Sequence, residues 1–166
     1  MAAEPRFFEI VEVLARHGVE FILVGGVAAI LEGAPVSTFD LDVVIRSTPE
    51  DRQRLLGALH EIHAHYLDPA GRQFVPDAEK LESFRIQRLV TDLGPLDVLR
   101  SIGAGRSYDD LIAETLFHDV GSVSVRTLNL ATIIRSKEEA NRDKDRAVLP
   151  ILYRTLQLKK ILPEEK

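Results

Sequence analysis

Residues 21–45 decide the fold, and they read FILVGG, then VAAILEGAPVSTF, then DLDVVI. The first part is an apolar run that ends in Gly25-Gly26, and the last part is a second apolar run that contains Asp40 and Asp42. Side chains alternate along a strand, so two carboxylates at positions i and i+2 project from the same face. Two neighbouring acids in an apolar strand are costly unless something positive binds them, and a divalent metal ion is the obvious candidate.

The composition fits one soluble domain with no membrane partner. The chain has 166 residues, of which 45% are hydrophobic and 28% charged, and this length is enough to bury a core. No uncharged apolar run reaches the roughly 18 residues of a membrane span, and the N-terminal sequence shows no secretory signal. Cysteine is absent, so we expect a cytoplasmic protein without disulfides.

Charge is distributed unevenly along the chain. The formal net charge is −5, which argues against broad, non-specific binding of nucleic acid. Residues 135–166 nevertheless contain nine Lys/Arg and six Asp/Glu, a local charge of +3. If the protein binds an anionic partner, we expect this C-terminal segment to hold it.

Hydrophobic spacing and turn residues predict a single α/β domain over residues 1–166. Short continuous apolar runs such as 21–24 suit strands that are buried on both faces. The sequence DLGP at 92–95 is turn chemistry that joins two strands as a hairpin. The expected helices lie at residues 5–17, 27–31, 49–65, 107–115, 130–139 and 142–158. The expected strands lie at residues 21–24, 41–45, 84–90, 96–99, 117–120 and 123–125, with a loop at 67–80.

The predicted hairpin places a third acid, Asp97, inside the apolar strand LDVL at 96–99. Three acids on adjacent strands are the arrangement that holds two divalent ions about 3.5–4 Å apart. The glycine pair that follows the first strand can bring backbone N–H groups close to a phosphate. Together these features predict a site for nucleotide phosphates and for displacement at phosphorus.

The order of these elements resembles a known family. Gly25-Gly26, thirteen residues, Asp40-Leu41-Asp42-Val43 and a later Leu96-Asp97-Val98 resemble the signature of the DNA-polymerase-beta-like nucleotidyltransferase superfamily. That signature is hG[G/S], a short gap, Dh[D/E]h, and then h[D/E]h on a neighbouring strand.

The C-terminal part resembles particular members of that superfamily. Ser136-Lys137, followed by Arg142, Lys144 and Asp145, is similar to the small prokaryotic members related to abortive-infection toxins and minimal antitoxin-like enzymes. The resemblance implies a nucleotidyltransferase fold, with a mixed central sheet flanked by helices and with C-terminal helices. Residues 1–126 would form the catalytic α/β core, and residues 127–166 the helical part.

The resemblance also implies a reaction and its residues. A nucleoside monophosphate would pass from an NTP such as ATP to a hydroxyl acceptor, with two Mg²⁺ ions and release of pyrophosphate. Asp40, Asp42 and Asp97 would be the catalytic acids and metal ligands, and Asp97 the base that accepts the acceptor's proton. The implied nucleotide-binding residues are Gly25, Gly26, Ser37, Thr38, Lys137 for the triphosphate's charge, and Asp145 for orienting Lys137.

The chain departs from the family pattern at two places, and the acceptor stays open. Many members carry Ser at the position of Gly26, and many small members have an Arg where this chain has Pro35-Val36; Arg46 is a candidate to compensate.

The acceptor is either a macromolecule, such as RNA (tRNA) or the partner protein of a toxin–antitoxin pair, or a small hydroxylated compound of the antibiotic type. The +3 segment slightly favours a macromolecule. The competing classes are a non-catalytic antitoxin-like binding module and an ordinary α/β domain with structural acids.

Three histidines form an HxxHxH pattern that could be mistaken for a metal site. His60 and His63 lie one turn apart on the predicted helix, but His65 points elsewhere. We therefore interpret the pattern as part of a solvated helix surface.

Overall fold

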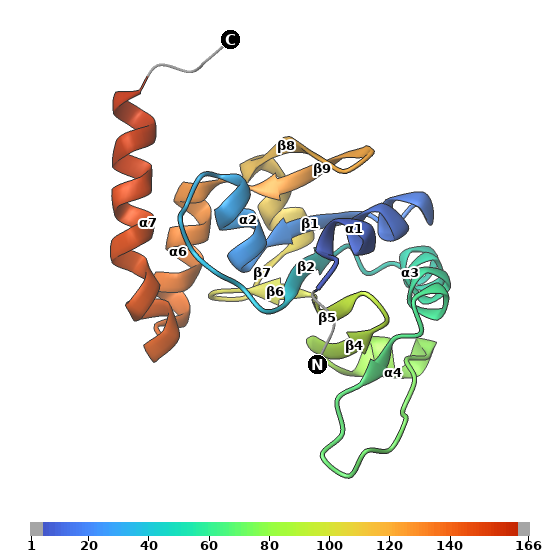
Figure 1. Ribbon diagram of the computed structural model, residues 1–166. Coiled ribbons are helices and arrows are strands. Elements are labelled where there is room, and N and C mark those ends of the chain that lie inside the picture. Colours follow the sequence, from blue (N-terminus) through green and yellow to red (C-terminus); the bar gives the residue numbers. More distant parts are fainter. Residues whose placement is uncertain (1–4, 163–166) are drawn as a thin grey trace.

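A seven-stranded mixed sheet forms the centre of the computed structural model, which describes residues 5–162 (Figure 1). The strand order is β3-β4-β5-β2-β1-β9-β8. These strands are β1 (Phe21–Val24), β2 (Leu41–Ile45), β3 (His65–Tyr66), β4 (Ile86–Thr91), β5 (Gly94–Leu99), β8 (Thr115–Val120) and β9 (Val123–Leu128). A separate two-stranded sheet is formed by β6 (Ser101–Ile102) and β7 (Arg106–Ser107).

The pairing of β2 at the middle of the sheet brings distant parts of the sequence together. β2 runs antiparallel to β1 on one side and parallel to β5 on the other. β4 and β5 form one antiparallel hairpin, and β8 and β9 form another. Because β2 and β5 are parallel, Asp42 lies directly beside Asp97, more than fifty residues later in the chain.

Helices cover the sheet in two groups. α1 packs against α3, and α6 packs against both α2 and α7. Figure 1 shows α6 and α7 side by side at one end of the molecule, away from α3 and α4. The helices are α1 (Phe7–Arg16), α2 (Gly25–Leu31), α3 (Pro49–Glu61), α4 (Ala78–Ser83), α5 (Tyr108–Leu111), the 3-10 turn η1 (Ile112–Glu114), α6 (Leu130–Ala140) and α7 (Asp143–Ile161).

Local sequence explains why these elements form. All four residues of β1 are buried, as its continuous apolar sequence predicts for a central strand. In β2, Asp42 is the one residue that is not fully buried. α3 begins with a capping box between Thr48 and Asp51, with Pro49 in the first turn.

A buried glutamate ties the C-terminal helices to the rest of the fold. Glu32, which follows α2, is only 5% exposed and accepts a 2.9 Å hydrogen bond from the backbone N–H of Leu130 at the start of α6. Its other oxygen lies 3.0 Å from His118 Nε2 and 3.1 Å from Lys159 Nζ. Burial raises the pKa of this carboxyl, but these partners outweigh burial, so the pKa lies below its usual value. Glu32 therefore fixes α6 and α7 relative to α2.

The structure confirms the predicted α/β class and corrects several element boundaries. The hairpin that carries Asp97 is present. The helix predicted at 49–65 is wrong at its end, because it stops at Glu61 and His63 adopts a left-handed backbone with φ of 53°. The chain then forms β3, which pairs with β4. The loop predicted at 67–80 contains the start of α4, and β6 and β7 were not predicted.

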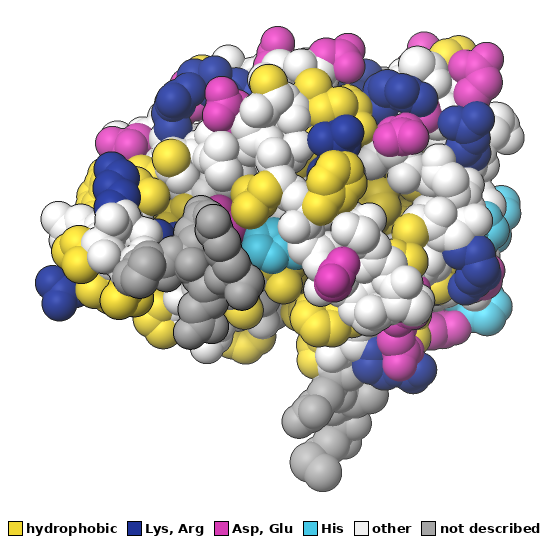
Figure 2. Space-filling model, turned by 90° about the horizontal axis from the view of Figure 1, so that it is seen from above, with side chains coloured by type: hydrophobic (Ala, Val, Ile, Leu, Met, Phe, Trp, Pro, Cys, Tyr) yellow, Lys and Arg dark blue, Asp and Glu magenta, His cyan; other side chains and the backbone are white. Residues whose placement is uncertain are grey.

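The surface carries mixed charge, and the histidine pattern is part of it. Figure 2 shows a face on which basic and acidic side chains are intermingled between hydrophobic ones. His63 contacts Asp92 at an exposed position. Among residues 5–162, the histidines belong to no group of three or more side chains placed to share a metal ion. No helix in the described part of the chain has the length and apolar character needed to cross a bilayer.

Candidate active site

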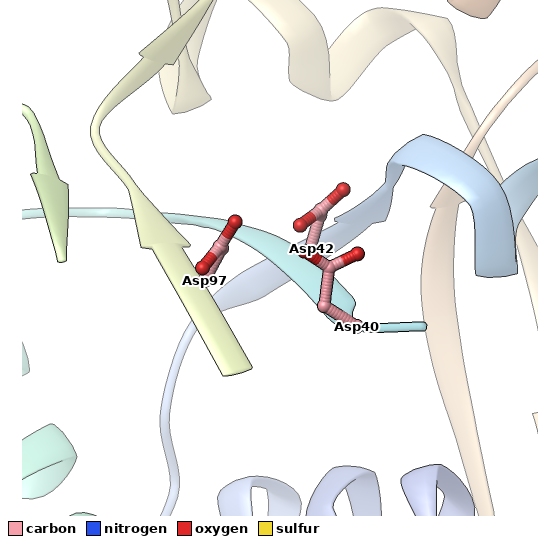
Figure 3. Close-up of side chains that lie close together, drawn as sticks. All are labelled: Asp40, Asp42 and Asp97. Carbon is pink, nitrogen blue, oxygen red and sulfur yellow. The ribbon is translucent and has the colours of Figure 1, made fainter. Parts of the chain in front are cut away.

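Three carboxylates converge where β2 and β5 lie side by side. Asp42 and Asp97 are register partners in these strands, and Asp40 immediately precedes β2. One oxygen from each carboxylate lies within 4.8 Å of those from the other two, and Figure 3 shows the three side chains gathered together. The structure therefore brings together the three acids that the sequence pattern assigned to adjacent strands.

The crowded, partly buried position of Asp42 and Asp97 raises the pKa of both carboxyls. Burial and, next, the negative charges of Asp40 and Asp97 together raise the pKa of Asp42 to about 7, against the opposing effect of Lys137 and Lys144. Burial and the charge of Asp40 also raise the pKa of Asp97. A carboxyl whose proton is lost only near neutral pH is the expected consequence of a crowded acidic site without a bound cation.

The glycine pair makes room for this site. Gly25 has a φ of +66°, and a Cβ at this position would lie 2.2 Å from Asp42 Oδ2. At Gly26 a Cβ would lie 2.6 Å from Cβ of Thr38. The Thr38 hydroxyl donates a 2.9 Å hydrogen bond to the carbonyl of Asp40. The two glycines thus allow α2 to begin directly against the chain that carries the acids.

The C-terminal helices bring basic side chains to the acids. Asp145 is completely buried and accepts hydrogen bonds from Arg142 Nε at 2.7 Å and Arg142 Nη2 at 3.2 Å. Its Oδ1 also lies 3.5 Å from Lys137 Nζ. Burial raises the pKa of Asp145, but the hydrogen bonds from Arg142 outweigh burial and the pKa is lowered. Asp145 therefore stays ionised and holds two cations beside Asp42.

Two recesses meet at Asp40 and Asp42. The first, here the α2-side recess, has a volume of about 430 Å³. The second, here the β4-side recess, has a volume of about 360 Å³ and includes Asp97. Arg142 and Lys144 line both recesses. The α2-side recess is also lined by Gly26, Ser37, Thr38, Phe39, Lys137 and Val148. The β4-side recess is also lined by Arg85, Arg88, Ser101, Ile102 and Gly103.

Most of the residues assigned to nucleotide binding lie around the α2-side recess, with two exceptions. Gly25 lines a smaller hollow beside Asp42 and Lys137, and Asp145 is buried behind Lys137. Arg46, the candidate to replace the missing family arginine, does not reach the acids. Its guanidinium is bound to Asp51 at 2.7 and 3.1 Å.

Sequence reasoning missed Arg88, which faces the acidic site from β4. Arg88 is the register partner of Asp97 in the β4–β5 hairpin, and its charge lowers the pKa of that acid. The turn sets which residues pair across the hairpin, but the turn predicted at 92–95 is two residues too long to give this pairing. In the structure the hairpin turns at residues 92–93, so that Thr91 pairs with Gly94 and Arg88 with Asp97; a turn over all of 92–95 would have placed residue 90 opposite residue 97.

Comparison with solved structures identifies the fold. A crystal structure from Thermotoga maritima, of a protein provisionally named a nucleotidyltransferase, matches with a TM-score of 0.55 and 14% sequence identity. The match covers 87% of this chain and 88% of that chain. This chain has a nucleotidyltransferase fold. At this level of identity the likeness shows the fold alone. No protein-family model and no curated protein matches the chain.

Two glycine substitutions test whether Gly25 serves the acids. Gly25→Ala and Gly33→Ala both force a positive φ on alanine, at +66° and +97°, but only Gly25 has atoms of Asp42 in the way. Each variant should lose about 1–2 kcal/mol of stability from backbone strain. Gly25→Ala should also turn Asp42 aside and weaken Mn²⁺ binding by at least about tenfold, as measured by electron paramagnetic resonance. Equal Mn²⁺ affinity in the two variants would show that Gly25 has no special role.

The pKa of Asp42 predicts a pH-dependent stability in the metal-free protein. The folded state, with a pKa of about 7 at Asp42, binds more protons than the unfolded state between about pH 4 and 7. The free energy of unfolding in EDTA should therefore fall as the pH rises through this window. Asp42→Asn removes the contribution of this carboxyl. At pH 8 the free energy of unfolding of the variant should therefore exceed that of wild type by about 2 kcal/mol, roughly half of the free energy that corresponds to the whole pKa shift of Asp42. At pH 4 the free energies of unfolding of the two proteins should be nearly equal.

Urea unfolding at both pH values measures this difference. Asp119→Asn, at an exposed position on β8, serves as the control and should show the wild-type pH dependence. An Asp42→Asn protein that is less stable than wild type at pH 8 would contradict the assignment of Asp42 as a destabilised, unpaired acid.

Proposed function

We propose that this protein is a Mg²⁺-dependent nucleotidyltransferase that moves a nucleoside monophosphate from an NTP to a hydroxyl acceptor. The observation that carries the proposal is the cluster of Asp40, Asp42 and Asp97, with oxygens within 4.8 Å of one another, at the junction of two recesses. The donor set fits Mg²⁺, which prefers carboxylate oxygens shared with substrate phosphates. The raised pKa of Asp42 supports this fit, because a bound cation would relieve the repulsion.

The α2-side recess has the chemistry expected of an NTP site. Lys137, Arg142 and Lys144 offer positive charge to a triphosphate. Ser37 adds a hydroxyl group at the same wall, next to Thr38, whose own hydroxyl donates to the carbonyl of Asp40. Phe39 is 85% exposed and, together with Val148, gives the recess an apolar surface on which a nucleobase can stack. We therefore assign the donor nucleotide to this recess.

The β4-side recess is left for the acceptor. Asp97 lines this recess and is absent from the lining of the α2-side recess. In our proposal Asp97 takes the proton from the acceptor hydroxyl, whose oxygen forms a bond to the α-phosphorus as the bond to the pyrophosphate oxygen breaks. Lys137, held in place by Asp145, balances the charge of the departing pyrophosphate. Two Mg²⁺ ions held by the three aspartates would neutralise negative charge on the transferring phosphate.

We propose a macromolecular acceptor, RNA or a protein, ahead of a small hydroxylated compound. The β4-side recess supports this choice, because it shares lining residues with a further recess beyond Arg85 and Ser101. The role of the protein within a toxin–antitoxin pair stays a prediction from the sequence resemblance. A cytoplasmic location is likewise a prediction from composition.

The test is transfer of label from each of the four α-³²P-labelled NTPs, with Mg²⁺, to RNA, to protein and to small hydroxylated compounds. Wild type should label at least one acceptor class, and EDTA should abolish labelling. Asp42→Asn and Asp97→Asn should each lower the rate by at least about 100-fold, since each removes a charge that the reaction needs. Asp119→Asn is the matched control and should keep the wild-type rate.

Calorimetry separates this reading from the non-catalytic alternative. The transferase should bind Mg²⁺–NTP, and Asp42→Asn should lose that binding. Wild type that neither binds Mg²⁺–NTP nor labels any acceptor would overturn the proposal and favour a binding module of the same fold.

A further inference from the structure

A third recess, here the arginine recess, adjoins the proposed acceptor side of the site. It has a volume of about 500 Å³. Arg85 and Ser101 line both this recess and the β4-side recess, so these two residues form a wall that the two hollows share. The side chains that define the arginine recess here are Arg46, Arg85, Arg100, Ser47, Ser101 and Tyr108.

Two of the three arginines of this recess carry positive charge that no carboxylate in the described part of the chain pairs with. Arg46 is ion-paired with the buried Asp51. Arg85 donates a 3.0 Å hydrogen bond to the carbonyl of Ser101, which carries no net charge. Within residues 5–162, neither Arg85 nor Arg100 has a carboxylate within ion-pairing distance.

Two acidic side chains near the arginine recess offset part of this positive charge. Asp109 lines the arginine recess at an exposed position. Glu20, an exposed residue, accepts a 3.2 Å hydrogen bond from the hydroxyl of Tyr108, which lines the recess. The guanidinium groups of Arg85 and Arg100 therefore remain available to an anion.

The chemistry of the recess fits phosphate groups. A guanidinium presents its N–H donors in a planar fork that matches two phosphate oxygens. The hydroxyl group of Ser47 adds a further polar group at the same hollow. Basic residues are intermingled with acidic ones on the face in Figure 2, whereas here three arginines line one concave surface.

The position of the arginines relative to Asp97 indicates what kind of phosphate compound fits. Arg88 lies beside Asp97 in the β4-side recess, Arg85 lies at the shared wall, and Arg100 and Arg46 lie beyond it. This is a succession of cations leading away from the proposed base. A nucleic-acid strand carries one phosphate per nucleotide, so it can contact several of these cations in turn. A compound with a single phosphate can contact them at only one position.

We propose that the arginine recess binds the phosphodiester backbone of a single-stranded nucleic acid whose terminal hydroxyl reaches Asp97. This inference rests on the proposed transferase function. It assigns the acceptor to Arg85 and Arg100, outside the basic segment 135–166 that the sequence pointed to. Of the cations in that segment, Lys137 lines only the donor recess of the two, whereas Arg142 and Lys144 line both recesses where they meet at Asp40 and Asp42.

Fluorescence anisotropy with labelled 12-nucleotide RNA and DNA tests the assignment. Arg100→Ala should weaken binding of the oligonucleotide by about fivefold to tenfold at low salt, through loss of charged hydrogen bonds. The dependence of log K on log salt should become shallower by about 0.7. Arg154→Ala, which removes an arginine from α7 on another part of the surface, is the control and should bind as wild type does.

Three further results decide the outcome. Arg100→Ala that binds oligonucleotide like Arg154→Ala overturns the proposal, and so does ribose 5-phosphate that competes as well as the unlabelled strand. Mg²⁺–NTP binding measured by calorimetry should be unchanged in Arg100→Ala, which also shows that the variant is folded. Wild type that binds the strand through Arg100 but never binds Mg²⁺–NTP would support the nucleic-acid site and overturn the transferase function.

Discussion

The main physical constraint on this site is the mutual repulsion of three carboxylates that the sheet holds close together. The parallel register of β2 and β5 places Asp42 beside Asp97, and the chain entering β2 adds Asp40. Burial and this crowding raise the pKa of Asp42 to about 7. The fold retains an unfavourable concentration of negative charge that divalent cations would neutralise, which is the usual condition of a prepared metal site.

Other features of the fold make room for the three carboxylates or place cations near them. Gly25 lacks the Cβ that would collide with Asp42, so the first helix after β1 can begin against the acids. Buried Glu32 fixes α6 and α7 to α2, and buried Asp145 then holds Lys137 and Arg142 near Asp42. The cations offset part of the repulsion without forming ion pairs with the triad, which leaves the carboxylate oxygens available to metal ions.

Sequence alone could predict the features that are local or that depend on one tight turn. Gly25-Gly26, the Asp40–Asp42 spacing and the hairpin that carries Asp97 all lie within short segments whose patterns fix their geometry. The predictions failed where distant contacts decide. His63 ends α3 in a left-handed conformation and lets β3 join the sheet edge, and Arg46 turns to Asp51 instead of the acids. The arginine recess could not be predicted, since its residues come together only when α5, β4, β5 and the chain after β2 are folded.

The central claim is that the three aspartates hold divalent ions together with a nucleoside triphosphate, and crystallography tests it most directly. Crystals grown with Mn²⁺ and a non-hydrolysable ATP analogue would reveal metal positions by anomalous scattering. We predict two ions about 3.5–4 Å apart in contact with Asp40, Asp42 and Asp97, with the triphosphate beside Lys137. Saturating Mn²⁺ and nucleotide with no anomalous peak at the three carboxylates would contradict the claim.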